Sequence, residues 1–591
     1  MATTTRSSGV TVSISGPVQL DKLTAKRSVA GGAPPASGQG RVLVDALVGQ
    51  ELELVDAIHL SLPAGAPPKR RGGVAPSSTV ALDVPLGPDE HAVVLVEDEG
   101  DYRWIIAGEE LGPRPAASPV KRGRGGAATP PTAVRQARFS IPIQAAPPAK
   151  LPSSRGAPKR GWIADKLIGK ATAFVFRFAA KLVGPQVVKF FERNTRQGLI
   201  AMSSVDPDEW RLLGDDEPLP AKLPADRPAR VLLFIHGTFS STLGSFGALG
   251  AVAAGRDLLA RALAGYDLVI GFDHPTLSVD PYANATDVLV RLKRMDWPHP
   301  PVIDMIAFSR GGLTARSLIE QLLPGSRWGA KVGRVVFVGC TNGGTQLAEP
   351  ENWQRFADTY TNLALGAVRA LSLIPGAQAW THIAGEAIRG VGTLVKVLAT
   401  YAVTEKGVPG LAAMEPDGEF VRVINQRQPG QPTAAEAQYY AIMSNFEASA
   451  AMAQGATPEL PPKLLMRIAD WGADEIYREP NDLVVHVRSM THIDPSEGVF
   501  VKDRLDYGTN PSVYHTNYFT REDTAARLID WLGLSNVEGT KRPGAKHGAP
   551  KGKSVSKTGA AGATGRARSK TKATTGPATK RPVVRRAAAK P

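Results

Sequence analysis

The sequence predicts an α/β fold over residues 196–535, with a mostly parallel sheet covered by helices on both faces. Two observations carry this prediction. Apolar segments of strand length alternate there with segments of helical periodicity, as in sheets whose parallel strands are joined by helices. One strand candidate also passes through a tight turn directly into a helical pattern. The expected strands are 229–235, 267–272, 301–308, 333–339, 438–445 and 482–488.

The turn after residues 301–308 has the sequence AFSRG, with Ser309 at its centre. A sharp strand-to-helix turn brings the backbone on either side of this residue close together, so positions 307 and 311 require small side chains. Ala307 and Gly311 meet this requirement, although Ala307 stands where the motif of a nucleophile elbow more often has glycine. Ser309 is therefore a candidate nucleophile.

Asp482 and His515 are the candidate acid and base. A serine hydroxyl is a weak nucleophile at its free pKa, so an imidazole must accept its proton and a carboxylate must orient the imidazole. Asp482 lies at a turn beside an apolar segment, and His515 precedes a helix that reaches Trp531. The chain order Ser309, Asp482, His515 is that of α/β-hydrolase triads. His492 is the rival base, but His515 is favoured because its separation from Asp482 leaves room for a strand between them.

The loop that follows the first expected strand is a source of an oxyanion-hole amide in α/β-hydrolases. It contains His236, Gly237 and Phe239, and His236 is expected to position the loop. The other amide is that of Arg310, the residue after the candidate nucleophile. His274, in the segment FDHPT, is expected to line or brace the site.

Five segments resemble lipases of the α/β-hydrolase superfamily, and particularly their lipase and GPI-inositol-deacylase-like branch. The segments are FIHGTF (234–239), IAFSRGG (306–312), TNGGT (341–345), NDLVV (481–485) and HTNYF (515–519). By this resemblance Ser309 is the nucleophile, Asp482 the acid and His515 the base, and Thr238 supplies an oxyanion amide. The family spans lipases, phospholipases, amidohydrolases and inactive relatives, so the resemblance implies no particular substrate.

Residues 345–437 are predicted to form a helical cap over Ser309, as an insertion in the α/β domain. Two apolar helical stretches, 364–374 and 387–401, lie within it. The stretch 408–425 resembles the proline-marked segment that follows the lid of such lipases. An apolar cap favours a greasy acyl substrate, although the same residues also suit packing against the domain below.

Smaller parts are expected in the first 160 residues. Residues 1–40 are polar and rich in Gly and Pro, and are expected to be disordered. Strand-like runs such as RVLV (41–44) and AVVLV (92–96) predict a small β-rich module at 41–112. Residues 113–160, rich in Pro, Ala, Gly, Lys and Arg, are expected to form a linker.

Residues 161–195 are predicted to form basic amphipathic helices, the longer one at 162–183. Apolar residues recur there at helical intervals, Lys and Arg mark the other face, and Gly184-Pro185 ends the pattern. Packing of the apolar side on the α/β domain is the favoured interpretation. Contact of residues 162–196 with an anionic membrane surface is the alternative, but charges interrupt the run too often for a membrane span.

A basic tail, residues 536–591, carries the excess positive charge. Residues 541–591 contain fifteen Lys or Arg and no Asp or Glu, which equals the formal net charge of +15 of the whole chain. The composition predicts disorder and contact with polyanions through charge alone. Specific nucleic-acid recognition is not expected, because the tail has no aromatic residues to stack on bases.

Composition also excludes several classes of protein. Cys340 is the only cysteine, so an intrachain disulfide is excluded, and the sequence contains no metal-binding pattern of Cys and His. We therefore expect neither a metal nor another cofactor. One cysteine and a start without the apolar core of a signal peptide favour the cytoplasm, with peripheral membrane contact as an addition.

The sequence thus predicts a lipase-like serine hydrolase that cleaves carboxylic esters of acyl or lipid substrates through an acyl-enzyme. An amide-bond hydrolase with the same triad is one alternative. A hydrolase-fold scaffold without turnover, which acts through its basic helix and tail, is another. These patterns determine neither the acyl length, the head group nor the oligomeric state.

Overall fold

The structure is a computed structural model of the chain. Residues 1–540 form one compact unit and residues 541–591 a second. The second unit, and with it the predicted disorder of the basic tail, lies outside the described residues. The structure describes residues 2–15, 18–20, 39–61, 78–107, 109–114, 134–143, 170–180, 186–214, 217, 222–373, 381–400, 407–426, 437–455, 459–471, 477–493 and 501–538.

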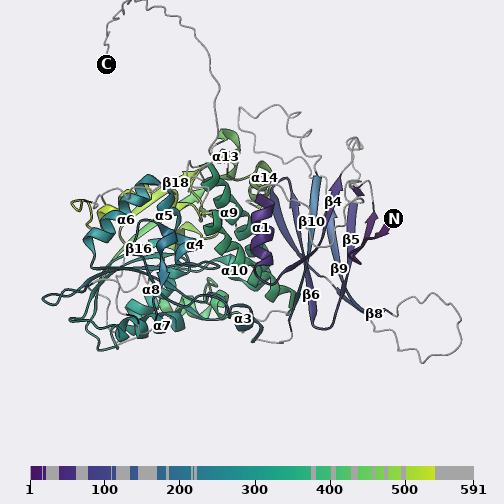
Figure 1. Ribbon diagram of the computed structural model, residues 1–591. Helices are drawn as coiled ribbons and strands as arrows, with labels where there is room; N and C mark the ends of the chain where they lie inside the picture. The colour runs from purple at the N-terminus through teal and green to yellow at the C-terminus, as the bar shows by residue number, and fades with distance from the viewer. Residues whose placement is uncertain are drawn as a thin grey trace, which may run out of the picture. The chain divides into compact units, whose positions relative to one another are not determined.

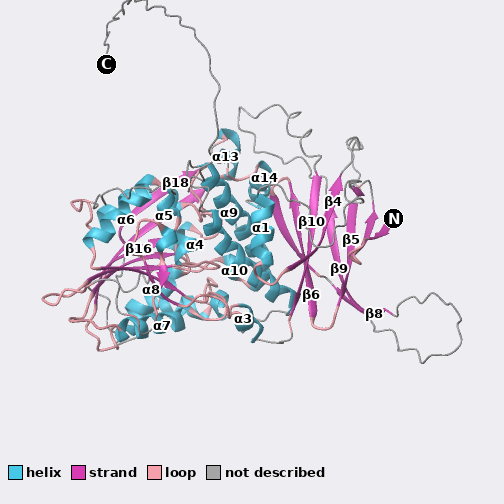
Figure 2. Ribbon diagram, in the orientation of Figure 1, coloured by secondary structure: helices cyan, strands magenta, loops and turns pink. Residues whose placement is uncertain are grey.

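An eight-stranded sheet forms the centre of the α/β domain (Figure 2). Six of its strands, from β14 to β18 in sheet order, run parallel, and β11 pairs antiparallel with β14 and β12. Five of the six expected strands are confirmed as β13 to β17. In sheet order the strands are β12 Arg211–Leu212, β11 Gly198–Ala201, β14 Leu268–Asp273, β13 Arg230–Ile235, β15 Val302–Phe308, β16 Lys331–Val338, β17 Gln438–Phe446 and β18 Val501–Asn510.

The expected strand at 482–488 is wrong. Asn481 and His486 form only an isolated β-bridge around a tight turn, and helix α15, Val487–Met490, follows. The turn forms because Asp482 Oδ1 accepts hydrogen bonds from the amides two and three residues later, at 3.1 and 2.8 Å. The strand at this edge of the sheet is β18 instead. Its residues are largely exposed or half-buried, so hydrophobic patterning does not reveal it.

Helices cover both faces of the sheet, because successive side chains of a strand point to opposite faces. Leu232 of β13 packs in a buried cluster with α6 and α16, whereas Val231 packs in another with α7 and α8. The predicted arrangement of a parallel sheet between helical layers is therefore confirmed. These helices are α6 Ala253–Gly265, α16 Glu522–Trp531, α7 Pro281–Arg294 and α8 Gly311–Arg316, which continues as a π-helix at Ser317–Leu322.

Two long helices lie in the segment expected to be a cap. They are α9, Trp353–Leu373, and α10, Thr381–Thr400, which pack against each other and agree with the helical stretches expected at 364–374 and 387–401. Their amphipathic faces contribute to the largest buried apolar cluster of the protein. Shorter helices of the same domain are α4 Thr242–Phe246, α5 Ala248–Ala251, α11 Pro409–Ala412, α12 Glu419–Ile424, α13 Ala448–Gln454 and α14 Pro462–Trp471.

Two five-stranded antiparallel sheets form a β-sandwich in the N-terminal part of the chain (Figure 1). Their orders are β1-β2-β5-β9-β8 and β3-β4-β10-β6-β7. Side chains from both sheets, such as Leu82 and Phe139 of one and Ile58 and Val94 of the other, form a single buried cluster. The strands are β1 Ala2–Thr5, β2 Thr11–Ser15, β3 Gln19–Leu20, β4 Glu53–Ser61, β5 Ser78–Leu86, β6 Glu90–Asp98, β7 Asp101–Ile106, β8 Glu109–Arg114, β9 Val134–Ile143 and β10 Lys170–Ala179.

The sandwich includes residues outside the β-rich module expected at 41–112. Strands β1 to β3 lie in residues 1–40, and β9 lies in the expected linker 113–160; most of the remainder of both segments is outside the described residues. The run at 41–44 belongs to helix α1, Gln39–Val48, rather than to a strand. Its buried residues Leu43, Val44 and Leu47 lie on one helical face that packs against α10.

The helix expected at 162–183 is wrong in its described part, which is strand β10. This strand lies between β4 and β6, and both its faces are buried: Val175 faces the sandwich core, and Phe176 belongs to the cluster that contains α9 and α10. A strand buried on both faces is apolar throughout, so periodicity alone does not separate it from a buried helix. The apolar residues of β10 therefore form no membrane-binding face. Helix α3, Gln186–Phe191, lies within the range 161–195 that was expected to be helical. None of the described helices has the length and apolar character needed to cross a membrane.

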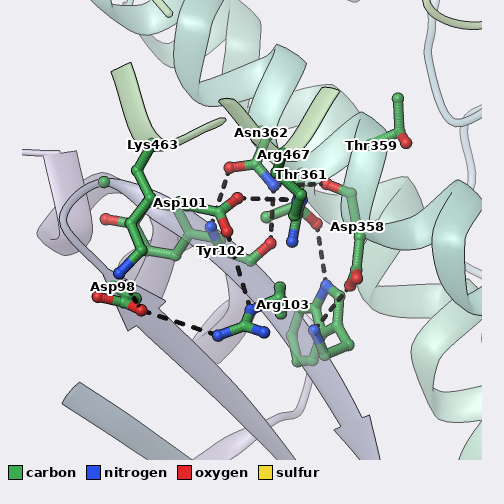
Figure 3. Close-up of polar contacts among 12 residues, drawn as sticks. Asp98, Asp101, Tyr102, Arg103, Asp358, Thr359, Thr361, Asn362, Lys463 and Arg467 are labelled. Atoms are coloured by element: carbon green, nitrogen blue, oxygen red, sulfur yellow. Dashed lines mark hydrogen bonds and ion pairs between the residues drawn. The ribbon is translucent and has the colours of Figure 1, made fainter. Parts of the chain in front are cut away.

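The edge strand β7 of the sandwich docks on helix α9 (Figure 3). The Trp104 amide donates to Asp358 Oδ1 at 2.7 Å, and Gln354 Nε2 donates to the Trp104 carbonyl at 2.6 Å. Asn362 Oδ1 accepts a hydrogen bond from the Tyr102 amide at 2.9 Å, and Asn362 Nδ2 donates one to the Tyr102 carbonyl at 2.7 Å. These three side chains recur every four residues along α9, so one helical face satisfies backbone groups that an edge strand leaves unpaired.

Candidate active site

Ser309 lies in the turn between β15 and α8, with a backbone φ of 54°. This left-handed conformation is uncommon outside glycine and is found at strained functional turns. The backbone segments around the turn are closely packed. A Cβ on Gly311 would lie 2.4 Å from the Ile235 carbonyl oxygen, and one on Gly237 would lie 2.6 Å from Ser309 Cβ. The close approach of β13 to the turn is thus the reason why position 311 requires a small residue.

His515 lies between Ser309 and Asp482. His515 Nε2 is 3.0 Å from Ser309 Oγ, and its Nδ1 is 2.9 Å from Asp482 Oδ2. In the neutral tautomer that fits both contacts, Nδ1–H donates to the carboxylate and Nε2 accepts the serine hydroxyl proton. The structure therefore brings the three predicted residues together in the order that a proton relay requires.

Four hydrogen bonds hold the Asp482 side chain. Besides His515 and the two amides of its own turn, it accepts a hydrogen bond from the Tyr518 hydroxyl at 2.9 Å. Burial raises the pKa of the Tyr518 phenol well above its ordinary value, so the phenol remains protonated and donates. Sequence reasoning missed Tyr518, although it lies in the HTNYF segment that carries His515.

The loop after β13 passes beside Ser309, as Gly237 shows by its close approach. The Phe239 amide is occupied, because it donates to Thr276 Oγ1 at 3.2 Å. The amides of Thr238 and Arg310, by contrast, donate to no other group among the described residues. Both predicted amides are therefore available to an added acceptor.

His236 and His274 support this loop as a stacked pair, with ring centroids 4.0 Å apart. His236 Nδ1 lies 2.9 Å from the Gly237 carbonyl oxygen, and its Nε2 accepts a hydrogen bond from the His274 amide at 3.1 Å. Burial lowers the pKa of both imidazoles, and for His274 the neighbouring His236 lowers it further. Both rings are thus neutral at pH 7 and serve as fixed supports.

Two buried charges, Glu192 and Arg310, hold the neighbouring loops. The Glu192 carboxylate accepts hydrogen bonds from the successive amides of residues 276–278, at 3.0, 2.9 and 2.6 Å. The Arg310 side chain donates to the carbonyls of Val279 and Gly410. Burial lowers the pKa of the Arg310 guanidinium to about 10, and Glu192 opposes part of that fall, so the side chain stays charged. Sequence reasoning missed Glu192, because its acceptor role depends on a loop that only the fold brings to it.

Helix α9 covers the aligned side chains. The Tyr360 ring lies edge-on to His515, with centroids 6.0 Å apart, and Phe356 and Tyr360 both pack on Phe239. Ser309 is only 1% exposed. The surroundings of the serine are therefore aromatic and closed to solvent in this conformation.

Two other candidate residues lie apart from this hydrogen-bonded series. His492 packs beside Gly343. Cys340 is buried next to Gly312, and burial raises the pKa of its thiol, which leaves it protonated and inert. Among the residues that the structure describes, no group of three His, Cys, Asp or Glu side chains has an arrangement that would hold a metal ion.

Two family models match parts of the chain. Residues 197–533 match a family described as a domain of unknown function (DUF7379), and residues 11–178 match one described as a domain of unknown function (DUF7362). These two ranges correspond to the α/β domain and the sandwich. No curated protein matches the sequence.

The chain is also similar to solved structures of lipases. Lipase 1 from Pelosinus fermentans is 15% identical with a TM-score of 0.34, over 52% of this chain and 98% of that one. The mature lipase BlEst2 from Bacillus licheniformis is 14% identical with a TM-score of 0.27, over 54% and 94%. Phospholipase PlaB from Legionella pneumophila is 10% identical with a TM-score of 0.25, over 45% and 46%. The GPI-inositol-deacylase-like branch stays a prediction.

Proposed function

We propose that this chain, which belongs to the family described as a domain of unknown function (DUF7379), is a serine hydrolase that cleaves carboxylic esters. The observation that carries the proposal is the hydrogen-bonded series of Asp482, His515 and Ser309, at 2.9 and 3.0 Å. Ser309 also lies at a strained turn after a parallel strand. Burial of a carboxylate and an imidazole destabilises the fold unless the two groups are paired. Their hydrogen-bonded arrangement next to a serine hydroxyl therefore supports a catalytic role.

The proposed reaction proceeds in two halves. As Ser309 Oγ attacks the ester carbonyl, His515 Nε2 takes its proton, and the amides of Thr238 and Arg310 stabilise the oxyanion. The C–O bond to the alcohol then breaks, and the alcohol leaves with the proton from His515. Water attacks the acyl-enzyme while His515 accepts its proton, and the carboxylic acid leaves as Ser309 regains that proton. Asp482 orients the imidazole and stabilises its charge throughout.

The acyl group of the substrate is proposed to be apolar. Phe239, Phe356 and Tyr360 pack together, with Tyr360 edge-on to His515, and Met414 Sδ lies 3.5 Å from Thr238 Oγ1. Such walls bind an acyl chain by burial, at about 0.8 kcal/mol per CH₂ group. Because Ser309 is closed to solvent, substrate entry requires α9 or its neighbours to move.

Labelling with a fluorophosphonate probe tests the nucleophile. Wild-type protein is expected to be labelled and to hydrolyse p-nitrophenyl esters, and Ser309→Ala is expected to lose both properties. Ser317→Ala is the matched control, because Ser317 is buried and its hydroxyl donates only to the Leu313 carbonyl of its own helix. A wild-type protein that is neither labelled nor active on esters of any acyl length would contradict the proposal.

Two alternatives are an amide-bond hydrolase, which differs in its substrate, and a hydrolase-fold scaffold, which has no turnover. An amide-bond hydrolase would use the same residues, so paired ester and amide substrates of one acyl group would identify it by turnover of the amide as well as the ester. A scaffold without turnover predicts no labelling of Ser309. The alignment of the three side chains favours turnover over the scaffold.

A further inference from the structure

Tyr360 brings a phenol to the proposed nucleophile from outside the triad. It lies in the middle of α9 and is 3% exposed. Its ring is 6.0 Å from the His515 ring, 5.1 Å from Phe239 and 5.0 Å from Phe356, measured between centroids. Burial raises the pKa of the phenol, and an interaction with the Ser309 hydroxyl opposes part of that rise. The hydroxyl therefore stays protonated, and the phenol lies beside the His515 ring that contacts Ser309.

This donor has no acceptor with normal hydrogen-bond geometry among the described residues. A buried hydroxyl without a partner destabilises the fold, so its presence needs a reason. The Ser309 hydroxyl is already directed to His515. The phenol thus lies next to the proposed base with an unused O–H, which suits an acceptor that is present only when substrate is bound.

We propose that Tyr360 is a catalytic residue whose hydroxyl donates a hydrogen bond to the ester oxygen that becomes negative when Ser309 attacks. It would act as a third donor beside the amides of Thr238 and Arg310. No proton is transferred, because burial raises the pKa of the phenol and keeps the proton on its oxygen. The bond strengthens as charge develops on the oxygen, so it lowers the barrier more than it tightens ground-state binding. This inference rests on the hydrolase function proposed above.

The sandwich holds the helix that carries this phenol. Asp358 and Asn362, two residues before and two residues after Tyr360, bind the backbone of β7 (Figure 3). Residues two apart on a helix lie on roughly opposite faces. One side of α9 is therefore fixed to the sandwich while Tyr360 projects from the other, and docking of β7 positions the phenol.

Tyr360→Phe tests the catalytic assignment, because it keeps the aromatic packing and removes only the oxygen. We expect kcat on a p-nitrophenyl ester to fall about 10- to 100-fold, with KM changed less than about twofold. The Tm should not fall, since a buried hydroxyl without a partner is removed. Tyr514→Phe is the matched control: its hydroxyl is also buried without a partner among the described residues, and the variant should keep wild-type kcat.

The outcomes separate this inference from the function on which it rests. A Tyr360→Phe kcat within about twofold of wild type, beside an inactive Ser309→Ala, overturns the role of Tyr360 alone. A wild-type protein that neither reacts with the probe nor hydrolyses esters overturns the proposed function.

Asn362→Ala tests the positioning by β7, because it removes both hydrogen bonds to the Tyr102 backbone. If Asn362 acts through Tyr360, the variant lowers kcat in the wild-type background but has little further effect in the Tyr360→Phe background. A merely structural role would lower kcat by the same factor in both backgrounds, and that result would overturn the positioning.

Discussion

Among single residues, Gly339 is important because there is no room for a side chain beside Asp482 and His515. Its φ is +53°, and a Cβ there would lie 3.1 Å from Asp482 Oδ2 and 3.4 Å from His515 Nδ1. Gly339→Ala is expected to lower kcat at least about tenfold, because a small displacement of the pair misaligns the relay. The left-handed backbone should also cost about 1–2 kcal/mol of stability. Ester kinetics and thermal unfolding measure the two effects.

Gly455→Ala is the control for the backbone cost alone. Gly455 has a φ of +59°, and a Cβ there would meet nothing within 4 Å. This variant should lose similar stability and keep wild-type kcat. An unchanged kcat in Gly339→Ala would show that the acid and base tolerate the methyl group.

At the scale of elements, the docking of β7 on α9 is expected to depend on pH through Asp358. Burial raises the pKa of its carboxyl from 3.8 to about 7, and Arg467 opposes only part of that rise. Between about pH 4 and pH 7 the folded protein thus holds a proton that the unfolded chain has released. The stabilisation linked to this proton is complete below about pH 4 and is lost as pH rises through about 7.

Asp358→Asn isolates this effect, because the amide does not titrate and still offers an oxygen to the Trp104 amide. Thermal unfolding across this pH range should show the wild-type Tm falling relative to that of the variant as pH rises, and levelling above about pH 8. A difference in Tm that stays constant across the range would contradict the raised pKa.

For the whole molecule, the residues that carry the excess positive charge follow the first compact unit in the sequence. Residues 541–591 carry charge equal to that of the entire chain, and the first compact unit ends at Thr540. A chain that ends at residue 540 should keep the ester-hydrolase activity and Tm of the full chain. It should leave a heparin column at lower salt, because fewer counterions are released on binding. Elution at the same salt would contradict polyanion contact through the tail.

Sequence patterns alone predict the parallel strands β13 to β17 and locate the three side chains that the structure aligns. Both signals are local. A buried parallel strand is a continuous apolar run, and Ser309, Asp482 and His515 each occupy a turn or loop beside a strand or helix, where neighbouring residues mark the position.

The surroundings of these side chains depend on contacts between distant segments of the folded chain. The sequence of β10 suits a helix as well as a strand, and its pairing with β4 and β6 selects the strand. Local patterns assign no role to Glu192, Tyr360 or Tyr518, because each contacts a residue more than 30 positions away in the sequence. Periodicity reports which face of an element is buried, whereas contacts between distant segments arise only when the chain has packed.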